Sequence, residues 1–485
     1  MRTCVSKLLL AAAVLALGAC QDGDRSAPTA PIASQMDLRA PSMVQVCHES
    51  RRRGELIEVP AAALQSHLAH GDYVARLEVN TTVASGDGVH FRRITDALQA
   101  ARASRLAQGE LVTAACRITI VVPAGTYPGT TADLTADGVE HFPMLVDVPD
   151  ITLHGALTMT LDAAGRATGT GIGGAETVLT PVEPLPVVNA VSTPIIIANA
   201  HPGGSAGNGL VVEGFVFQSG HDPAVDAGGQ GVLTVRATRV TILGNRFEGG
   251  FTESLDLRGG SGDVARNHLG GTAGTCDICL AGPGSFHVHG NTLEAGGIPG
   301  IVLSGVLSLP VPVGVEPFVL PATGETWGDI RNNTVRDHER LPVGVGVRVD
   351  VLGVNAPNVY NTVHAVIQDN LLVHNRFGII VHAQTPKSGS GPLRSDAYVT
   401  LGRNAIEQSC EAKLLVSLAR HQTALGIGTN LYMQNSRYAI SLRGNLDWSE
   451  AWYGNPDGYG NVLTVDGDTI PNGVHQAYDA TKVCN

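Results

Sequence analysis

The stretch Ser254-Leu-Asp-Leu-Arg-Gly-Gly-Ser-Gly-Asp-Val-Ala-Arg-Asn-His-Leu269 contains one copy of the unit that decides the fold. An apolar strand with alternating side chains leads through a turn to a short strand of the form Asn-x-apolar. The first strand recurs at 232–236, 254–258, 277–281, 300–304, 345–350, 378–382 and 413–417, and the second begins at Asn245, Asn267, Asn291, Asn333, Asn370 and Asn404. The first three Asn are 22 and 24 residues apart. Short strands repeating with a period in the twenties predict a solenoid.

Composition agrees with such a fold and narrows the partners. A chain of 485 residues is too long for one compact core, and its 59 Gly residues suit the turns between short strands. The formal net charge of −12 argues against nucleic acid or an anionic membrane surface as the main partner.

The region 86–155 suggests a family. An amphipathic helix with Phe91, Ile94, Leu98 and Ala101 on one face is expected to run to about residue 107 and cap the solenoid. It is followed by Ile118-Thr-Ile-Val-Val-Pro-Ala-Gly-Thr-Tyr127, by Phe142-Pro143 and by Ile151-Thr-Leu-His-Gly155. This order resembles the start of right-handed parallel β-helix proteins, in particular the DUF1565 group of the pectate-lyase-like superfamily, over roughly residues 86–447. The resemblance implies an extracellular, often carbohydrate-directed protein. We predict an all-β, right-handed, single-stranded parallel β-helix with an N-terminal amphipathic capping helix.

The first residues look like an export signal. Arg2 and Lys7 precede the apolar run 8–17, which is too short to span a bilayer. The run ends in Leu17-Gly-Ala-Cys20, which resembles a bacterial lipobox and implies acylation of Cys20. We expect a lipoprotein signal peptide at 1–19, a flexible tether at 20–45, and an exported lipoprotein at the outer membrane or cell surface. An ordinary signal peptide is the alternative.

Residues 46–80 are expected to form a small separate module. Its Cys47-His48 and His67-Leu-Ala-His70-Gly-Asp72 resemble a short module of bacterial exported proteins. One thiol and three imidazoles offer Zn²⁺ a ligand set of Cys47, His48, His67 and His70. The alternative is a helix whose His side chains and Asp72 fix local turns.

The remaining boundaries and cysteines complete the layout. We expect a solenoid cap at 81–117, the parallel β-helix at 118–447 with a long excursion at 156–209, and a C-terminal cap at 448–485. Six Cys remain after Cys4 and Cys20 and permit three disulfides in 15 pairings. One candidate pairing is Cys410–Cys484. Cys276 and Cys279 are expected to form a local disulfide or to pair separately, rather than to bind a metal.

Three large insertions fall at one corner of the solenoid. From the first strand to the next Asn the distance is 10 or 11 residues in the early rungs, but 30, 21 and 23 residues in the later ones. Because rungs stack about 4.8 Å apart, these insertions should lie side by side. They should border one edge of the sheet that the first strands of the repeating units form. Insertions on one face of a repeat protein usually mark its binding face.

The outward positions of that sheet supply the candidate site. If Leu233, Leu255 and Val381 point inward, alternation places charges of both signs on the outer face. Ligand binding is assigned to Arg236, Asp256, Arg258 and Ser304, and catalysis to Arg348, Asp350 and His382. The guanidinium groups of the Arg residues would bind substrate carboxylates, and Arg348 or His382 could remove a proton from the substrate. An Asp carboxylate could bind a Ca²⁺ ion. The alternative is a solvated face with Asp–Arg pairs between rungs.

These features predict a surface-anchored protein that binds an extracellular polysaccharide, either acidic or neutral, and could cleave it as a lyase or hydrolase. A non-catalytic adhesin or scaffold of the cell envelope is the alternative. We expect a monomer that needs no cofactor, has no nucleic-acid partner and meets the membrane only through the Cys20 lipid. The six Asn are expected to be structural, with their amides bonding one another up the stack.

Overall fold

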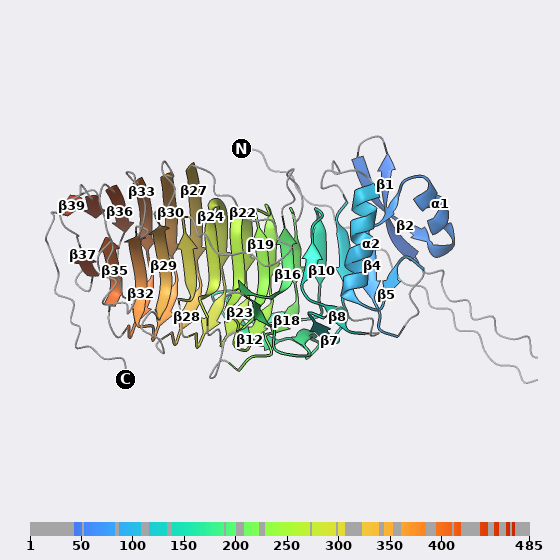
Figure 1. Cartoon of the computed structure of the whole chain (residues 1–485), viewed down its shortest axis with the longest axis horizontal. Helices are drawn as coiled ribbons and strands as arrows, with labels where there is room; N and C mark the ends of the chain where they lie inside the picture. The colour runs from blue at the N-terminus through green and yellow to red at the C-terminus, as the bar shows by residue number, and fades with distance from the viewer. Residues whose placement is uncertain are drawn as a thin grey trace, which may run out of the picture. The chain divides into compact units, whose positions relative to one another are not determined.

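The computed structural model describes a small N-terminal module followed by a stack of short strands (Figure 1). The described residues are 43–50, 53–82, 87–107, 116–132, 138–188, 191–199, 208–222, 228–271, 274–296, 299–305, 323–338, 344–352, 360–384, 394–409, 412–418, 437–444, 451–454, 462–465 and 468–470. The expected signal peptide, Cys20 and most of the expected tether lie outside them. Within the described part, no helix combines the length and the apolar character that a membrane span requires.

The stack has three faces, and a full rung places one strand, or one half of a longer strand, on each face. Face 1 consists of β9 (Met144–Val146), β16 (Pro194–Asn199), β19 (Gln230–Val235), the first halves of β22 (Glu253–Ala265) and β24 (Cys276–His289), β26 (Ile301–Ser304), β29 (Val345–Leu352), β32 (Phe377–Gln384), β35 (Ala412–Leu418) and β37 (Ala451–Gly454).

Face 2 follows face 1 around each rung. It consists of β4 (Arg76–Val79), β6 (Ile118–Val121), β10 (Ile151–His154), β17 (Val211–Glu213), β20 (Val240–Leu243), the second halves of β22 and β24, β27 (Thr323–Arg331), β30 (Tyr360–Gln368), β33 (Arg394–Gly402), β36 (Arg437–Gly444) and β38 (Val462–Val465). At its two ends, β5 (His90–Phe91) pairs with β4, and β39 (Asp468–Ile470) turns back antiparallel to β38.

Face 3 carries short strands of two to six residues. It consists of β8 (Glu140–His141), β7 (Gly125–Thr130), β13 (Thr177–Pro181), β18 (Phe215–Gln218), β21 (Arg246–Glu248), β23 (His268–Gly270), β25 (Thr292–Glu294), β28 (Thr334–Arg336), β31 (Leu371–Val373) and β34 (Ala405–Glu407). Pairing between successive described rungs is parallel on all three faces. The predicted parallel β-helix is therefore confirmed.

Side chains that point inward form one continuous core along the stack. The rings of Phe217 and Phe247 stack with centroids 4.7 Å apart, and Phe251 meets Phe247 edge-on. Rings that stack between adjacent rungs bury large side chains in a narrow interior at close packing.

The corner between faces 2 and 3 holds the predicted Asn ladder. Each amide from Asn245 to Asn370 donates to the side-chain oxygen of the next Asn, at 3.0 or 3.1 Å. The same amides also donate to a backbone carbonyl, as Asn291 does to Val264 at 2.8 Å. The ladder satisfies buried polar groups at a turn that repeats in every rung, which is a structural role.

The N-terminal end of the stack is covered by α2 (Ile94–Ala107), which buries Ile94, Leu98 and Ala101 as predicted. Phe91 lies ahead of the helix in β5. The buried carboxylate of Glu140 accepts the backbone N–H groups of Ile94 and Thr95 at 2.7 and 2.9 Å, which caps the helix from a distant strand.

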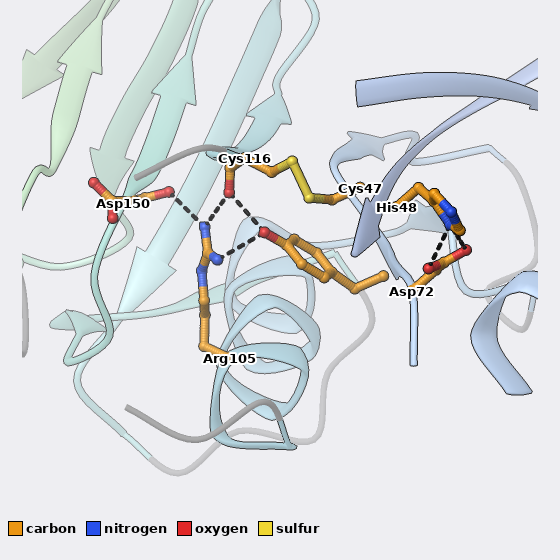
Figure 2. The surroundings of a disulfide bond; sticks show 7 residues. Cys47, His48, Asp72, Arg105, Cys116 and Asp150 are labelled. Atoms are coloured by element: carbon orange, nitrogen blue, oxygen red, sulfur yellow. Dashed lines mark hydrogen bonds and ion pairs between the residues drawn. A yellow bond between two sulfur atoms is a disulfide. The ribbon is translucent and has the colours of Figure 1, made fainter. Parts of the chain in front are cut away.

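The module has a three-stranded antiparallel sheet of β1 (Met43–Ser50), β2 (Arg53–Pro60) and β3 (Tyr73–Val74), with η1 (Ala61–Ala63) and α1 (Leu64–Ala69) between β2 and β3. A disulfide joins Cys47 to Cys116, just ahead of β6 (Figure 2). The buried Arg105 donates to the hydroxyl of Tyr73 at 2.9 Å and to the carbonyl of Cys116 at 2.7 Å. The module is thus fixed to α2 and the first rung.

Two stretches differ from the sequence prediction. The region 156–209 contains a hairpin of β11 (Met159–Leu161) and β12 (Ala167–Gly171) and a second of β14 (Val187–Val188) and β15 (Val191–Ser192). It also supplies β13 and β16, which pair in parallel with the stack, so it is not only an excursion. Past residue 447, β37 and β38 continue the parallel pairing.

Candidate functional site

The predicted rows of outward residues on face 1 are present from β22 to β32. Asp256 pairs with Cys279, Cys279 with Val302, Val302 with Arg348, and Arg348 with Ile380. The neighbouring row runs from Arg258 through Ala281, Ser304 and Asp350 to His382. The strand register therefore brings the predicted groups onto one side of one sheet.

The prediction for β19 was wrong by one position. Leu233 pairs with Asp256 and Val235 with Arg258, so these two aliphatic side chains occupy the outward rows. Thr234 pairs with the inward Leu257. Arg236 lies just past the strand in a left-handed backbone conformation, with φ of 56°. A strand that is buried on both faces has no polar–apolar alternation, so its sequence could not reveal its register.

The charges of these rows are buried and paired. Asp256 and Arg258 are 1% and 3% exposed, and the guanidinium donates to the carboxylate at 2.5 and 2.8 Å. Arg348 donates to Asp350 at 2.7 Å, and Asp350 is 4% exposed. The side chain of His382 lies outside the described residues. The expected open groove of free charges is thus replaced, where the structure describes it, by buried ion pairs.

A buried acid beside the first pair was missed from the sequence. Glu253 accepts a hydrogen bond from the amide of Gln230 at 2.8 Å, and the same amide lies 3.3 Å from Asp256. Burial, and then the charge of Asp256, raise the pKa of Glu253 to about 7. Such a carboxyl could hold a proton at neutral pH. However, Glu253 is only 5% exposed, so a substrate has no contact surface there.

The large insertions do share one corner. They connect β26 to β27, β29 to β30 and β32 to β33, which is the passage from face 1 to face 2 in each rung. Most of their residues, at 306–322, 353–359 and 385–393, lie outside the described part. This corner borders face 2 as directly as face 1, so the outer side of face 2 is equally a candidate binding surface.

On the outer side of face 2, three aromatic rings lie on successive rungs. Trp327 pairs with His364 and His364 with Tyr398 in the strand register. The ring centroids are 3.8 and 5.0 Å apart and the planes differ by 5° and 13°. Trp327 is 50% exposed and Tyr398 44%. We call these three residues the aromatic row. The sequence signal that could have found it is an aromatic residue at matching positions of three second-face strands.

The aromatic row ends at a small residue. Ser285 pairs with Trp327 on the preceding rung and is exposed. Among the described residues, no ring therefore stacks on the face of the indole that points toward Ser285. The indole N–H donates to Glu325 at 3.3 Å, which fixes the orientation of the ring. This arrangement leaves a flat aromatic face directed over Ser285.

Charged side chains flank the aromatic row. His287 lies 3.7 Å from Asp329, which also pairs with Arg331, and His289 lies 3.0 Å from Asp263. The contact with Asp263 raises the pKa of His289 and lowers that of the carboxyl. These side chains are largely exposed and present both donors and acceptors to solvent. Together with the aromatic row they form a mixed polar and aromatic surface across β24, β27 and β30.

A separate groove of about 800 Å³ lies between α2 and face 1. Its lining is mostly aliphatic, from Leu98, Leu106, Leu145 and Ile197, with Arg102 and His141 among the polar residues. Few polar groups converge there, so the groove does not offer the hydrogen bonds that a hydroxyl-rich ligand requires.

The predicted zinc ligands are only partly brought together. The prediction of Cys47 as a ligand was wrong, because its sulfur is bonded to that of Cys116. His70 is exposed at the end of α1 and does not belong to the cluster. His48 and His67 do meet, and the third group beside them is the carboxylate of Asp72. A thiol next to His48 in an extended strand points to the opposite face of the strand, which explains the error.

Among the other cysteines, Cys276 and Cys279 form the local disulfide that was one of the expected outcomes. The candidate pair Cys410 and Cys484 lies outside the described residues.

No protein-family model matches the sequence, and no curated protein is detectably similar to it. Among solved structures, the chain is similar to an endo-xylogalacturonan hydrolase from Aspergillus tubingensis, with 10% identity over 81% of this chain and 92% of the other and a TM-score of 0.36. It is also similar to the A-module of the mannuronan C-5 epimerase AlgE6 from Azotobacter vinelandii, with 12% identity, 77% and 89% coverage and a TM-score of 0.31. At these values the fold assignment rests on the strand register and the function on the side chains of this chain.

Proposed function

We propose that this protein binds an extracellular polysaccharide on the outer side of face 2, with the aromatic row as the centre of the contact. The observation that carries the proposal is the exposure of Trp327 and Tyr398 on a regular stack of rings. Exposed aromatic surface of this kind is costly in water and usually marks an interaction site. Among exposed large apolar side chains of the described residues, these two are the aromatic ones.

The position of Ser285 suggests how a sugar would bind. Successive rings of the row are one rung apart, so a ring placed over Ser285 would continue the stack. A pyranose ring has an apolar C–H face that can pack on the free face of Trp327, while its hydroxyl groups reach His287 and Asp329. Aromatic rings combine apolar area with polar neighbours in this way at low entropic cost.

The charges around the aromatic row favour a neutral polysaccharide over an acidic one. Asp263, Glu325 and Asp329 carry carboxylates there, against the guanidinium groups of Arg331 and Arg266 and the imidazole of His289. These charges are close to balanced, so the surface has no excess of cations to attract a polyuronate. The first polysaccharides to test are therefore neutral, with acidic ones measured with and without Ca²⁺.

We propose binding rather than cleavage as the principal role. Of the residues predicted for catalysis on face 1, Asp350 is 4% exposed and is bonded to Arg348, whose side chain is 14% exposed. The predicted ligand-binding residues Asp256 and Arg258 are at most 3% exposed. Removing a proton or protonating a leaving group requires contact between that side chain and the substrate.

We also propose that acylation of Cys20 anchors the protein at the outer membrane or cell surface. Anchoring would hold the polysaccharide-binding face outside the cell. Incorporation of a labelled fatty acid, lost in Cys20→Ser, tests this part separately. Labelling that survives in Cys20→Ser would rule it out.

Affinity electrophoresis in gels containing neutral or acidic polysaccharides tests the main proposal. We expect retardation by at least one polysaccharide, a loss of about tenfold or more in affinity for Trp327→Ala, and a similar loss for Ser285→Trp, which fills the sugar position. Ile172→Ala is the control. It removes an exposed apolar side chain directly after β12, and this variant should bind normally. Retardation that is unchanged in both Trp327→Ala and Ser285→Trp would refute the site. The absence of retardation by all polysaccharides would refute the function and favour the scaffold alternative.

A further inference from the structure

We propose that His48, His67 and Asp72 form a binding site for a divalent transition-metal ion, with Zn²⁺ the ion that suits the donors best. The site is in the N-terminal module and is independent of the polysaccharide-binding face. Two imidazole nitrogens and a carboxylate are a common donor set for zinc sites that keep a position for water.

The end of α1 explains why His67 and Asp72 meet. The N–H of Asp72 donates to the carbonyl of His67, and the N–H of Gly71 donates to that of Leu68, both at 3.2 Å. These two bonds are those of a Schellman motif, which requires a left-handed residue after the helix. Gly71 supplies it with φ of 94°. The chain therefore reverses at Gly71 and returns Asp72 to the side of His67.

The sheet of the module brings in His48. Cys47 pairs with Tyr73 in the antiparallel register of β1 and β3, so the residues that flank this pair, His48 and Asp72, are also neighbours. Nδ1 of His48 lies 3.0 Å from both carboxylate oxygens of Asp72 (Figure 2). Nδ1 of His67 lies 2.7 Å from one of them. Two imidazoles from separate elements, β1 and α1, thus converge on one carboxylate.

The distances are close to those of a tetrahedral zinc site. The three donor atoms all lie within 4.8 Å of one another. Zinc–ligand bonds of about 2.0–2.1 Å place tetrahedral ligands about 3.3 Å apart. The nitrogen–oxygen distances of 3.0 and 2.7 Å to Asp72 are close to that spacing. The two imidazole donors lie no more than 4.8 Å apart, so modest rotation of the exposed side chains of His48 and His67 would bring all three donors to a zinc ion.

Exposure and support also fit a metal site. The carboxylate of Asp72 is buried, while the side chains of His48 and His67 are 42% and 28% exposed. The buried anion favours a cation, and the open side leaves room for a water ligand. The frame is rigid, because the Cys47–Cys116 disulfide and the hydrogen bond from Tyr73 to the carbonyl of Cys116 adjoin the site on both strands. When the ligand side chains are already held in place, binding of an ion costs little conformational entropy.

The test is a titration of the EDTA-treated full chain with Zn²⁺, with bound metal measured after gel filtration. We expect one equivalent per chain, and a loss of at least tenfold in affinity for His48→Ala and for His67→Ala. His70→Ala is the matched control, since it removes an exposed imidazole of the same segment, and it should bind normally. Co²⁺ should give the absorption bands of a tetrahedral or five-coordinate nitrogen–oxygen site, and these should be absent in His67→Ala.

Three outcomes would overturn the proposal. Zn²⁺ could fail to bind at micromolar concentration, in which case the cluster is only a hydrogen-bonded group that fixes the module. His70→Ala could lose binding as much as His67→Ala, which would place the site elsewhere. Alternatively, both His variants could retain full binding. Circular dichroism and a thiol count that confirms the Cys47–Cys116 disulfide show that each variant is folded, so that lost binding reflects lost ligands.

Discussion

The indole of Trp327 and the imidazole of His364 lie face to face, with centroids 3.8 Å apart and planes within 5° of each other. His364 is therefore the middle layer that supports Trp327 on one side and Tyr398 on the other. Burial between the rings lowers the pKa of His364, so the imidazole is neutral at physiological pH. The stacking therefore depends on the planar ring at position 364 and not on a positive charge there.

The first prediction concerns this middle ring. His364→Phe should keep the stack and bind polysaccharide within about twofold of the original protein. His364→Ala should leave both outer rings unsupported and weaken binding by about three- to tenfold, since an aromatic pair contributes about 0.5–1.5 kcal/mol. Titration calorimetry with the polysaccharide that retards the protein measures both. Equal losses for the two variants would contradict this role for the ring.

The second prediction concerns the pH dependence of stability. The pKa of Glu253, about 7 in the folded protein, lies above its ordinary value of 4.5, so the folded state holds this proton more tightly than the unfolded chain. The resulting stabilisation is complete below about pH 4.5 and is lost as the pH rises through about 7. Its size is about 3 kcal/mol.

Denaturant unfolding between pH 4.5 and 8 measures this dependence. Glu253→Gln, which cannot ionise, should unfold at higher denaturant than the original protein at pH 8, with a smaller difference at pH 4.5. Glu325→Gln removes an exposed carboxylate and serves as the control. A difference between Glu253→Gln and the original protein that does not grow with pH would show that the acid is not protonated in the folded state.

The third prediction concerns the Asn ladder. Asn291→Ala would leave the buried N–H of Asn267 and the buried carbonyl of Val264 without these partners. At about 1–3 kcal/mol for each such group, the loss should be about 3 kcal/mol. Asn404→Ala, at the half-buried end of the ladder, should cost about 1 kcal/mol. Thermal unfolding compares the two, and an equal cost at both positions would argue against burial as the cause.

The fourth prediction concerns the attachment of the module. The Cys47–Cys116 disulfide spans a sequence separation of 69 residues. Closing a loop of this length lowers the entropy of the unfolded chain and stabilises the fold by about 4 kcal/mol. Cys47→Ser with Cys116→Ser should therefore unfold at lower temperature and become sensitive to protease between 83 and 115. Unchanged melting and protease resistance would show that Arg105 and Tyr73 suffice to hold the module.

The sequence contained enough to predict the repeat but not every register. The six Asn marked the same turn in each rung, because a buried amide ladder requires Asn at that point. The alternation at 254–258 correctly placed Asp256 and Arg258 on the outer side of face 1. At 230–235 every residue is buried, so polarity gave no sign of which side chains point inward, and Leu233 was assigned to the wrong side.

The candidate site was harder to predict because it depends on distances between rungs. Trp327, His364 and Tyr398 are far apart in sequence, and only the parallel pairing of β27, β30 and β33 brings them together. In the module, His48 and His67 were identified from residue type alone. Asp72 was named only in the alternative, as a group that fixes local turns, and not as a ligand, because the turn at Gly71 rather than the helix face brings it to the two imidazoles.

The most direct test of the central claim is oxidative footprinting of Trp327 and Tyr398 with and without bound polysaccharide. We expect bound polysaccharide to protect both side chains, Trp327 more strongly, while the exposed Met43 in the module remains as reactive as before. Unchanged reactivity of Trp327 and Tyr398 while the polysaccharide is demonstrably bound would contradict the account.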